Sequence, residues 1–295
     1  MTPDLDLGQL RALAATVAAG TLDGAARALN VTPSAVSQRL KALEKATGRV
    51  LLVRTKPVRV TESGQTVLRL ARQVEHLAAD ALRDLGGGDD AAPVMLSIAV
   101  NADSMATWVL PALAPLAGEY RFDLHREDQE RTSVLLREGT VMAAVTADAT
   151  PVPGCSVTRL GAMRYRPMAT AAFAQRWLPE GATAEALGRA PLVVFDRDDD
   201  LQHRYLRRRG VTGRPPEHYV PASVDFVEAI RLGLGWGMVA DAQVPEGELV
   251  ELDRDGAIDV VLHWQQWRLH SPGLDRVAEA VIAAARTALD QPLRR

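Results

Sequence analysis

The chain has 295 residues, of which 47% are hydrophobic and 24% are charged, so it has material for two or three folded domains. This composition excludes a mainly disordered chain, and no segment approaches the roughly 20 apolar residues of a membrane-spanning helix. The first residues hold acids and no basic stretch, unlike a signal peptide, and the single Cys155 cannot form an internal disulfide. We therefore expect a cytoplasmic protein.

The net charge of −3 is unevenly distributed along the chain. Residues 1–85 hold 12 Lys and Arg against 8 Asp and Glu, a net charge of +4, whereas residues 86–295 hold 22 against 29, a net charge of −7. A basic first third joined to an acidic remainder indicates that only the N-terminal part meets a polyanion. A net charge of +4 is also common on small helical domains, so charge alone leaves nucleic-acid binding open.

Three short helices are predicted before residue 50, from apolar residues at helical spacing. Their expected bounds are about 10–19, 22–29 and 33–47. Thr21 and Thr32 stand where an N-cap is needed for the second and third helices. Pro33 takes the first position of the third helix, where its missing N–H costs nothing. The second and third helices are joined by a short turn around Asn30, which is the spacing of a helix-turn-helix.

A small β-wing and a long helix are predicted to follow. Two extended stretches, 50–54 and 58–61, are separated by Lys56-Pro57, and Thr61 can cap a helix over 62–85. Apolar residues of this helix recur every seven positions and form a narrow seam suited to pairing with a second copy. The expected dimerisation residues are Val67, Leu70, Val74, Leu77 and Ala81. The alternative is that this helix lies on its own domain.

The third helix has the features of a DNA recognition helix. Its apolar residues face inward and leave small polar side chains near its N-terminus, where Gln can pair with adenine and Ser can accept or donate. Three cations of the wing fit phosphate contacts beside such a helix. The candidate DNA-binding residues are Thr32, Pro33, Ser34, Ser37, Gln38, Lys41, Arg54, Lys56 and Arg59. The alternative is an ordinary helical pair with a solvated face.

The glycine-rich segment 86–90 marks the clearest boundary, and strands alternate with helices after residue 93. Strands are expected at 95–100, 120–125, 141–146, 164–169, 192–195, 219–221, 237–240 and 260–267. Helices are expected at 104–116, 132–137, 173–177, 201–209, 224–234 and 274–289. This alternation predicts an α/β fold with parallel strand pairing.

The N-terminal third resembles the winged helix-turn-helix of the LysR-type transcriptional regulators. The residues that carry the resemblance are Ala25-Ala26, Leu29, Ser34-Ala35-Val36-Ser37, Leu40, Leu43-Glu44, Gly48, Leu51, Arg54 and Thr61-Glu62-Ser63-Gly64. The family usually has Phe at the place of Leu52, which is a conservative change. Residues 96–116, LSIAVNADSMATWVLPALAPL, resemble the ArgP/LysG branch of the family, as do LLVRTKP, REDQERT, GAMRYRPMAT and PLVVFDRDDDLQ.

The resemblance covers the whole chain and implies its organisation. It implies a winged helix-turn-helix over 1–61, a linker and dimerisation helix over 62–85, a flexible hinge over 86–93 and an effector-binding domain over 94–295. The effector domain is expected to be periplasmic-binding-protein-like, with two Rossmann-like subdomains, one about 94–162 and 246–295 and the other about 163–245. The branch implies L-lysine, L-arginine or histidine as effector, activation of a basic-amino-acid exporter gene, a homodimer or tetramer, and contact with RNA polymerase.

Acidic residues at predicted strand ends agree with a cationic amino acid as ligand, because its two ammonium or guanidinium groups need carboxylates and its own carboxylate needs donors. Ligands of such sheets bind beyond the carboxyl ends of the strands. The candidate effector-binding residues are Asp103, Ser104, Glu127, Asp128, Asp148 and Asp196. Any one of these acids could equally be a local cap or a solvated loop residue.

Signals of catalysis are weak, and we expect no enzyme and no metal or cofactor. The six histidines show no metal-ligand spacing, and the calcium-like spacing of Asp196, Asp198 and Asp200 lacks the required glycine. No G-x-S-x-G segment occurs, and Cys155 has no basic neighbour in the sequence. The competing interpretations are a solute-binding or enzyme domain fused to a helical dimerisation arm, and a structural DNA-binding protein without effector.

Overall fold

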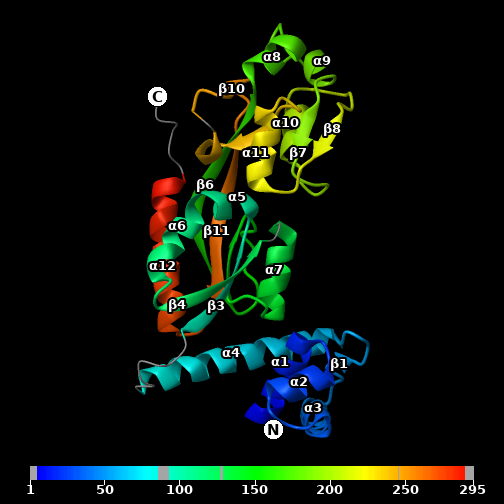
Figure 1. Cartoon of the computed structure of the whole chain (residues 1–295), viewed down its shortest axis with the longest axis vertical. Coiled ribbons are helices and arrows are strands. Elements are labelled where there is room, and N and C mark those ends of the chain that lie inside the picture. The colour runs from blue at the N-terminus through cyan, green and yellow to red at the C-terminus, as the bar shows by residue number, and fades with distance from the viewer. Residues whose placement is uncertain (1–4, 86–92, 127–128, 245, 290–295) are drawn as a thin grey trace.

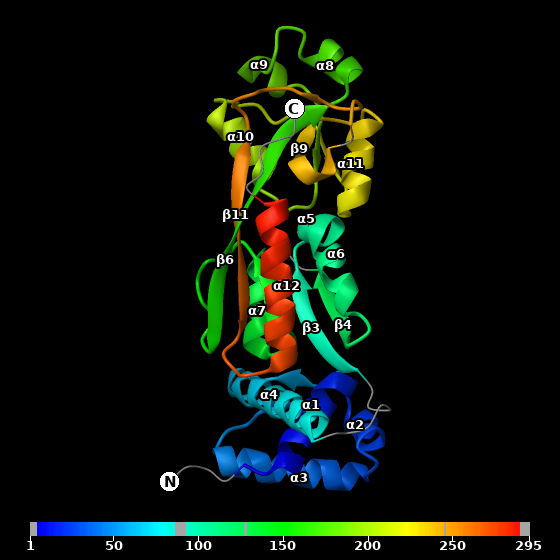
Figure 2. The same ribbon diagram turned by 90° about the vertical axis from the view of Figure 1, so that its left-hand side faces the viewer.

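The structure is a computed structural model, and it describes residues 5–85, 93–126, 129–244 and 246–289. Three parts follow one another along the longest axis (Figures 1 and 2). The N-terminal domain lies at one end, the long helix α4 (Glu62–Asp84) lies beside it, and the two subdomains of the effector domain complete the molecule. The predicted hinge spans residues 86–93, of which 86–92 lie outside the described residues.

The N-terminal domain is a three-helix unit built as the sequence predicts. Its helices are α1 (Leu7–Ala19), α2 (Leu22–Ala28) and α3 (Pro33–Thr47). The expected N-caps are present, since the Thr21 side chain accepts a hydrogen bond from the Gly24 amide and that of Thr32 accepts one from the Ala35 amide. The apolar faces of the three helices form one core, whose buried members include Leu10, Leu13, Val36, Leu40, Leu43 and Leu51.

The wing is a two-stranded antiparallel sheet of β1 (Leu52–Val53) and β2 (Arg59–Val60), shorter than predicted. Leu52 is buried in the domain core, so Leu fills this position without leaving it exposed. The start of α4 packs closely against the backbone just before β1. A Cβ at Gly64 would lie 2.0 Å from the carbonyl oxygen of Leu51, so this approach requires glycine.

Helix α4 presents three different faces. One face packs Leu68 and Ala71 into the core of the N-terminal domain, with Val67 and Val74 partly buried beside them. A second face meets the effector domain through Arg72, whose Nη1 donates to the Glu138 carbonyl oxygen at 3.3 Å and to Thr140 Oγ1 at 3.1 Å. The third face carries exposed apolar residues, namely Leu70, Leu77 and Ala81.

The effector domain is built on one mixed sheet with the strand order β10-β6-β11-β5-β3-β4, to which β9 adds along β6. The strands of the first subdomain are β3 (Val94–Val100), β4 (Tyr120–Arg126) and β5 (Ala143–Thr146), which pair in parallel. Its helical segments are α5 (Ala102–Ser104), the π-turn η1 (Met105–Val109), α6 (Leu110–Leu113), η2 (Ala114–Leu116), α7 (Gln129–Glu138) and α12 (Pro272–Ala288). Helix α12 buries Val277 and Val281 in the main core.

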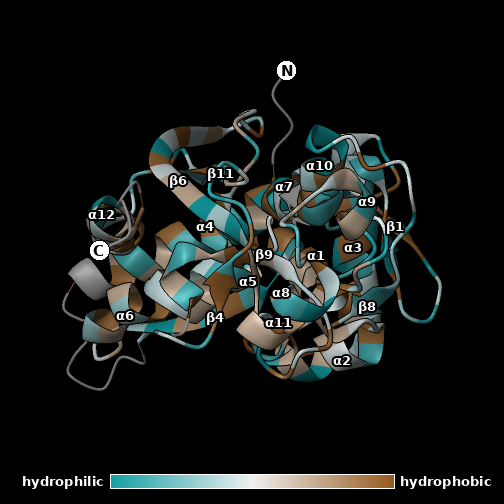
Figure 3. Ribbon diagram, turned by 90° about the horizontal axis from the view of Figure 1, so that it is seen from above, coloured by the Kyte–Doolittle hydropathy of each residue, from teal (hydrophilic) through white to brown (hydrophobic). Residues whose placement is uncertain are grey.

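The second subdomain is smaller and carries a separate parallel pair, β7 with β8. Its elements in chain order are α8 (Ala171–Trp177), α9 (Ala184–Leu187), β7 (Leu192–Val194), α10 (Leu201–Arg208), β8 (Glu217–Tyr219), α11 (Ser223–Arg231), β9 (Gly237–Ala240), η3 (Asp241–Gln243) and β10 (Val250–Glu251). Hydrophilic and hydrophobic residues alternate along the ribbons of the effector domain, as one-sided burial requires (Figure 3).

Two long strands, β6 (Cys155–Ala169) and β11 (Ile258–Trp267), run antiparallel through both subdomains and join them (Figure 2). The sequence predicted only the last six residues of β6. Its first part, residues 155–163, does not alternate strictly between buried and exposed residues, and it contains Gly161, next to which the register with β11 shifts. The predicted parallel pairing is present among β3, β4 and β5 and between β7 and β8. It does not extend to β6, β9, β10 and β11, which pair antiparallel.

Candidate functional sites

The recognition helix α3 presents the predicted polar face to solvent. Val36, Leu40 and Leu43 are buried against the domain core, whereas Ser34, Gln38 and Lys41 are exposed and Ser37 is partly exposed. The helix N-terminus is fixed by Thr32, whose Oγ1 also lies 2.9 Å from Ser34 Oγ. A helix of this kind, capped at one end and packed along one side, holds its outer side chains in register for the major groove.

The wing stands beside α3 and is held to it. Glu44 of α3 accepts a hydrogen bond from the Leu51 amide at 2.9 Å, just before β1. The three predicted cations, Arg54, Lys56 and Arg59, are all exposed on or next to the wing. The structure therefore gathers polar residues of α3 and cations of the wing on neighbouring elements, which suits base contacts flanked by phosphate contacts.

A second group of polar residues lies at the junction between the two subdomains and centres on Asp103. Strand β3 ends at Val100, and Asp103 follows in α5. Its Oδ2 accepts a hydrogen bond from the Tyr165 hydroxyl at 2.7 Å, and its Oδ1 accepts one from the hydroxyl of Ser223, at the start of α11. Gln243 in turn donates to Ser223 Oγ at 2.6 Å. Asp103 thus joins the first subdomain, the shared strand β6 and the second subdomain.

Two buried polar atoms near Asp103 lack a hydrogen-bond partner within the described part of the chain. They are the Oγ of Ser104, a residue that is fully buried, and the Oδ1 of Asn101. A buried polar atom without a partner costs free energy, so such atoms are usually satisfied by water or a ligand. Ser104 was predicted from the sequence as an effector contact, and its unpaired hydroxyl fits that assignment.

Asp199 supplies a second carboxylate at the junction. It accepts hydrogen bonds from the Phe195 amide at 3.2 Å and the Leu201 amide at 3.0 Å. Burial raises the pKa of Asp199 above the ordinary value of 3.8, and the negative charge of Asp103 raises it further. Burial also raises the pKa of Tyr165 well above 10.0, with Asp103 as the next cause, so Tyr165 stays a hydrogen-bond donor. Two acids therefore share a partly desolvated space.

The other predicted acids have local contacts or are not described. Asp148 accepts from the Thr150 amide at 2.8 Å, and Asp196 accepts from the Asp198 and Asp199 amides at 2.8 and 3.0 Å. These bonds are those of turn residues, and a role of Asp148 or Asp196 in binding stays a prediction. Glu127 and Asp128 lie outside the described residues.

Sequence reasoning missed four residues of the junction, namely Tyr165, Asp199, Ser223 and Gln243. Asp199 sits in the run DRDDD at 196–200, in which the sequence gives no sign of the acid that turns inward. Ser223 and Gln243 belong to elements that become neighbours only when α11 and η3 fold onto β6. An unusual Tyr between two Arg in a strand was the one available signal for Tyr165.

In the described residues, no three His, Cys, Asp or Glu residues are placed to hold a metal ion, and no helix is long and apolar enough to cross a membrane. Burial raises the pKa of Cys155 to about 11, which disfavours the reactive thiolate at neutral pH.

The N-terminal domain and the effector domain match models of the same protein family. Residues 7–65 match the bacterial regulatory helix-turn-helix protein of the lysR family, and residues 94–287 match the LysR substrate binding domain. The lysine export transcriptional regulatory protein LysG of Corynebacterium efficiens is 42% identical over 278 residues, covering 92% of this chain and 94% of its own.

Solved structures show the same similarity in three dimensions. The crystal structure of ArgP from Mycobacterium tuberculosis is 44% identical, has a TM-score of 0.91, and covers 98% of this chain and 100% of its own. The full-length LysG of Corynebacterium glutamicum with bound effector Arg is 39% identical, with a TM-score of 0.81, and covers 97% of this chain and 100% of its own. With both domains matched and relatives aligned along nearly the whole length, the chain belongs to the LysR family of DNA-binding transcriptional regulators, and its work is regulation and not catalysis.

Proposed function

We propose that the chain is a cytoplasmic regulator that binds operator DNA as a homodimer and activates a basic-amino-acid exporter gene when L-lysine or L-arginine is bound, with histidine as a third candidate effector. The names of the relatives support this proposal, because one is a lysine export regulator and another holds arginine as effector. A tetramer made of two such dimers and a contact with RNA polymerase belong to the same proposal.

The observation that carries the effector assignment is the pair of acids at the subdomain junction. Asp103 comes from the first subdomain and Asp199 from the second, and the negative charge of Asp103 is one of the causes that raise the pKa of Asp199. Bringing a cation between two such carboxylates relieves that repulsion and replaces lost hydration. An ammonium or guanidinium group is therefore the ligand chemistry that this junction favours.

Ser104 is the candidate for the carboxylate of the effector. Its buried hydroxyl can donate to an oxygen anion, and in the described residues this atom has no other partner. A hydrogen bond to a charged group contributes about 1.5–3 kcal/mol, enough to select amino acids over simple amines. In this arrangement the α-carboxylate meets Ser104, and the two cationic groups meet Asp103 and Asp199 in an order that we leave open.

Binding at this place would change how the subdomains meet. Ser223 of α11 donates to Asp103 in the structure. An effector cation that contacts Asp103 competes with this hydroxyl and so changes the distance between α5 and α11. Because each subdomain is a packed unit joined by β6 and β11, the change is a rotation of one subdomain against the other.

The third face of α4 supports the dimer. Leu70 is 37% exposed and Leu77 is 40% exposed, although the other two faces of the same helix are covered by this chain's own domains. Leu70, Leu77 and Ala81 belong to the predicted seven-residue repeat, and Val67 and Val74 lie at its edge against the N-terminal core. An apolar helix face of this kind is suited to pairing with the same face of a second copy.

Calorimetric titration of the full-length protein with lysine, arginine, histidine and leucine tests the effector. We expect lysine or arginine to bind and leucine not to bind, and we expect Asp103→Asn to weaken binding by about ten- to a hundredfold, the factor for the loss of a charge-assisted contact. Asp198→Asn is the control, because it removes an exposed carboxylate that is outside the candidate effector-binding residues. Tight binding of leucine, or unchanged lysine binding by Asp103→Asn, would contradict the assignment.

A gel-shift titration with DNA from upstream of the protein's own gene tests the regulatory part. We expect a retarded complex whose mobility or affinity changes when lysine is added. A complex that forms equally on unrelated DNA of the same length, with no response to lysine or arginine, would support a structural DNA-binding protein instead.

A further inference from the structure

We infer that Arg166 is a positioning residue for the effector site, which it holds in place from the opposite face of the shared strand β6. This inference rests on the proposed function, because it concerns how the same junction is held in place. Arg166 lies on β6 and faces the acids of the second subdomain, away from Asp103. Its effect on the site passes through the segment η3.

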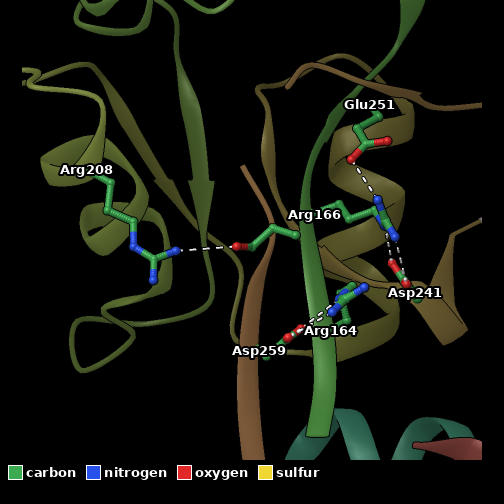
Figure 4. Close-up of polar contacts among 7 residues, drawn as sticks. Arg164, Arg166, Arg208, Asp241, Glu251 and Asp259 are labelled. Carbon is green, nitrogen blue, oxygen red and sulfur yellow. Dashed lines mark hydrogen bonds and ion pairs between the residues drawn. The ribbon is translucent and has the colours of Figure 1, made fainter. Parts of the chain in front are cut away.

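Arg166 makes two ion pairs that join both edges of β6 (Figure 4). Its Nε donates to Asp241 Oδ1 at 2.7 Å, and its Nη2 lies 3.4 Å from Asp241 Oδ2. Its Nη1 donates to Glu251 Oε1 at 2.8 Å. Asp241 follows β9 on one edge of β6, and Glu251 lies in β10 on the other edge. The guanidinium is only 14% exposed, so these contacts are screened little by water.

Asp241 connects these ion pairs to the effector site. It is the first residue of η3, a short 3-10 helix that ends at Gln243. Gln243 donates to Ser223 Oγ at 2.6 Å, and Ser223 donates to Asp103. The position of the Ser223 hydroxyl therefore depends on where η3 lies, and η3 is held by Arg166 through Asp241.

The contacts close into a ring that begins and ends on neighbouring residues of one strand. Tyr165 and Arg166 are consecutive in β6, and consecutive side chains of a strand point to opposite faces. Tyr165 donates to Asp103 on one side, while Arg166 binds Asp241 on the other. Displacement of Ser223 from Asp103 by an effector is thus resisted by a segment that is anchored to β6, the strand that both subdomains share.

Arg164 provides a matched control on the same strand. It lies two residues before Arg166 on the same face and pairs with Asp259 of β11 at 2.7 Å (Figure 4). Both partners are more exposed, at 43% and 46%, and Asp259 lies in β11, on the edge of β6 opposite to β9 and the η3 segment that follows it. Loss of this pair removes an arginine and an ion pair from β6 and leaves the route to Ser223 intact.

The experiment compares Arg166→Met, Arg166→Lys, Gln243→Leu and Arg164→Met in the full-length protein, by calorimetric titration with lysine and arginine and by thermal unfolding. We expect Arg166→Met and Gln243→Leu to weaken effector binding about tenfold each, the factor for a change of ~1.4 kcal/mol. Arg166→Lys should recover part of the affinity, and Arg164→Met should bind like the wild type. The double variant Arg166→Met/Gln243→Leu should lose little more than either single variant, because both act through η3.

The outcomes separate this inference from the proposed function. If the wild type binds neither lysine nor arginine, the proposed function fails and the ring has no effector to position. If the wild type binds and Arg166→Met binds within twofold of it, the positioning role is wrong. If Arg166→Met does not fold, Gln243→Leu decides, because Gln243 is partly exposed and lies outside the ion pairs. Full additivity of the two substitutions would also contradict a shared route.

Discussion

His76 of the linker helix lies against Ser271 of the effector domain, with Nε2 and Oγ 2.7 Å apart and both side chains buried. Asp80, one turn further along α4, lies 3.4 Å from the same nitrogen. Ser271 is also the N-cap of α12, where its Oγ accepts from the Leu274 amide at 3.4 Å. A buried polar contact thus joins the helix that carries the DNA-binding domain to the start of the last helix.

The linker helix contacts the chain near the ends of both shared strands. Ser271 comes four residues after the last residue of β11, and Arg69 donates at 2.8 Å to the carbonyl oxygen of Pro153, two residues before β6 begins. These are the two strands that connect the subdomains. The subdomain rotation that we propose would therefore displace segments that contact α4. The described contacts at this place include hydrogen bonds, which can be exchanged.

His76→Ala should lower the free energy of unfolding by about 1–3 kcal/mol, because it leaves the Ser271 hydroxyl and the Asp80 carboxylate in a buried interface without this imidazole. Urea unfolding followed by fluorescence measures the change. Arg69→Ala is the control, since its contact with Pro153 is exposed and should matter much less. An equal loss of stability in both variants would show that the buried contact contributes no more to the free energy of unfolding than the exposed one.

Leu77→Glu should separate the dimer. The substitution places a carboxylate in the predicted seam, where a buried unpaired charge costs several kcal/mol unless the copies part. Light scattering at micromolar concentration should then give the monomer mass, and operator affinity should fall with it. Leu82→Glu is the matched control, because Leu82 is 65% exposed on the same helix and lies outside the seam. A dimer mass for Leu77→Glu would count against pairing through α4.

Gln38→Ala and Arg54→Ala should affect DNA binding in different ways. Loss of the Gln38 side chain should reduce discrimination between the operator and other sequences by about 1–3 kcal/mol, the value of a bidentate base contact. Loss of Arg54 should weaken binding to all sequences and reduce the slope of log affinity against log salt by about 0.9, the value for one phosphate. Fluorescence anisotropy at several salt concentrations distinguishes the two effects.

Arg121→Ala is the control for those variants, since it removes one exposed cation from β4 of the effector domain. It should leave both specificity and salt slope unchanged. The recognition-helix assignment would be wrong if Gln38→Ala and Arg54→Ala bound the operator with wild-type affinity and wild-type salt dependence.

The N-terminal domain was predictable because its structure is set by local signals. Thr21 and Thr32 cap the helices that the apolar spacing predicts, and the inward and outward faces of α3 follow from a period of 3.6 residues. The exposed face of α4 was also visible as a seven-residue repeat. The sequence could not show that Val67 and Val74 are shared with the N-terminal core, because that depends on tertiary packing.

The effector site was only partly predictable because its residues come from elements far apart in the chain. Asp103 and Ser104 follow a strand that the sequence predicts, and their positions were expected. Asp199 lies among three other acids, and its inward direction depends on amides at Phe195 and Leu201. In the sequence, Arg166 is one of several arginines in a predicted strand. Its role depends on β9 and β10, which pair with the two edges of β6 only in the folded structure.

Asp199 makes opposite contributions to stability and to effector binding. Burial and Asp103 raise its pKa above the ordinary value of 3.8, so the folded protein keeps this proton to a higher pH than the unfolded chain does. Between those two pKa values the folded state binds more protons than the unfolded state, and the free energy of unfolding therefore falls as pH rises. A cationic effector, in contrast, needs the ionised carboxylate.

The wild type should accordingly bind lysine more tightly as pH rises from 3.8 through the raised pKa of Asp199, by at most about tenfold per pH unit for one titrating group. Asp199→Asn should bind lysine more weakly at neutral pH and show a smaller slope. Its melting temperature relative to the wild type should rise over the same pH interval, because the variant has no carboxylate to ionise at this position. Asp198→Asn, at the exposed neighbouring position, should follow the wild type in both measurements. Calorimetry and thermal unfolding across this pH interval measure the two trends. If the lysine affinity of the wild type and of Asp199→Asn changed equally with pH, Asp199 would not belong to the effector site.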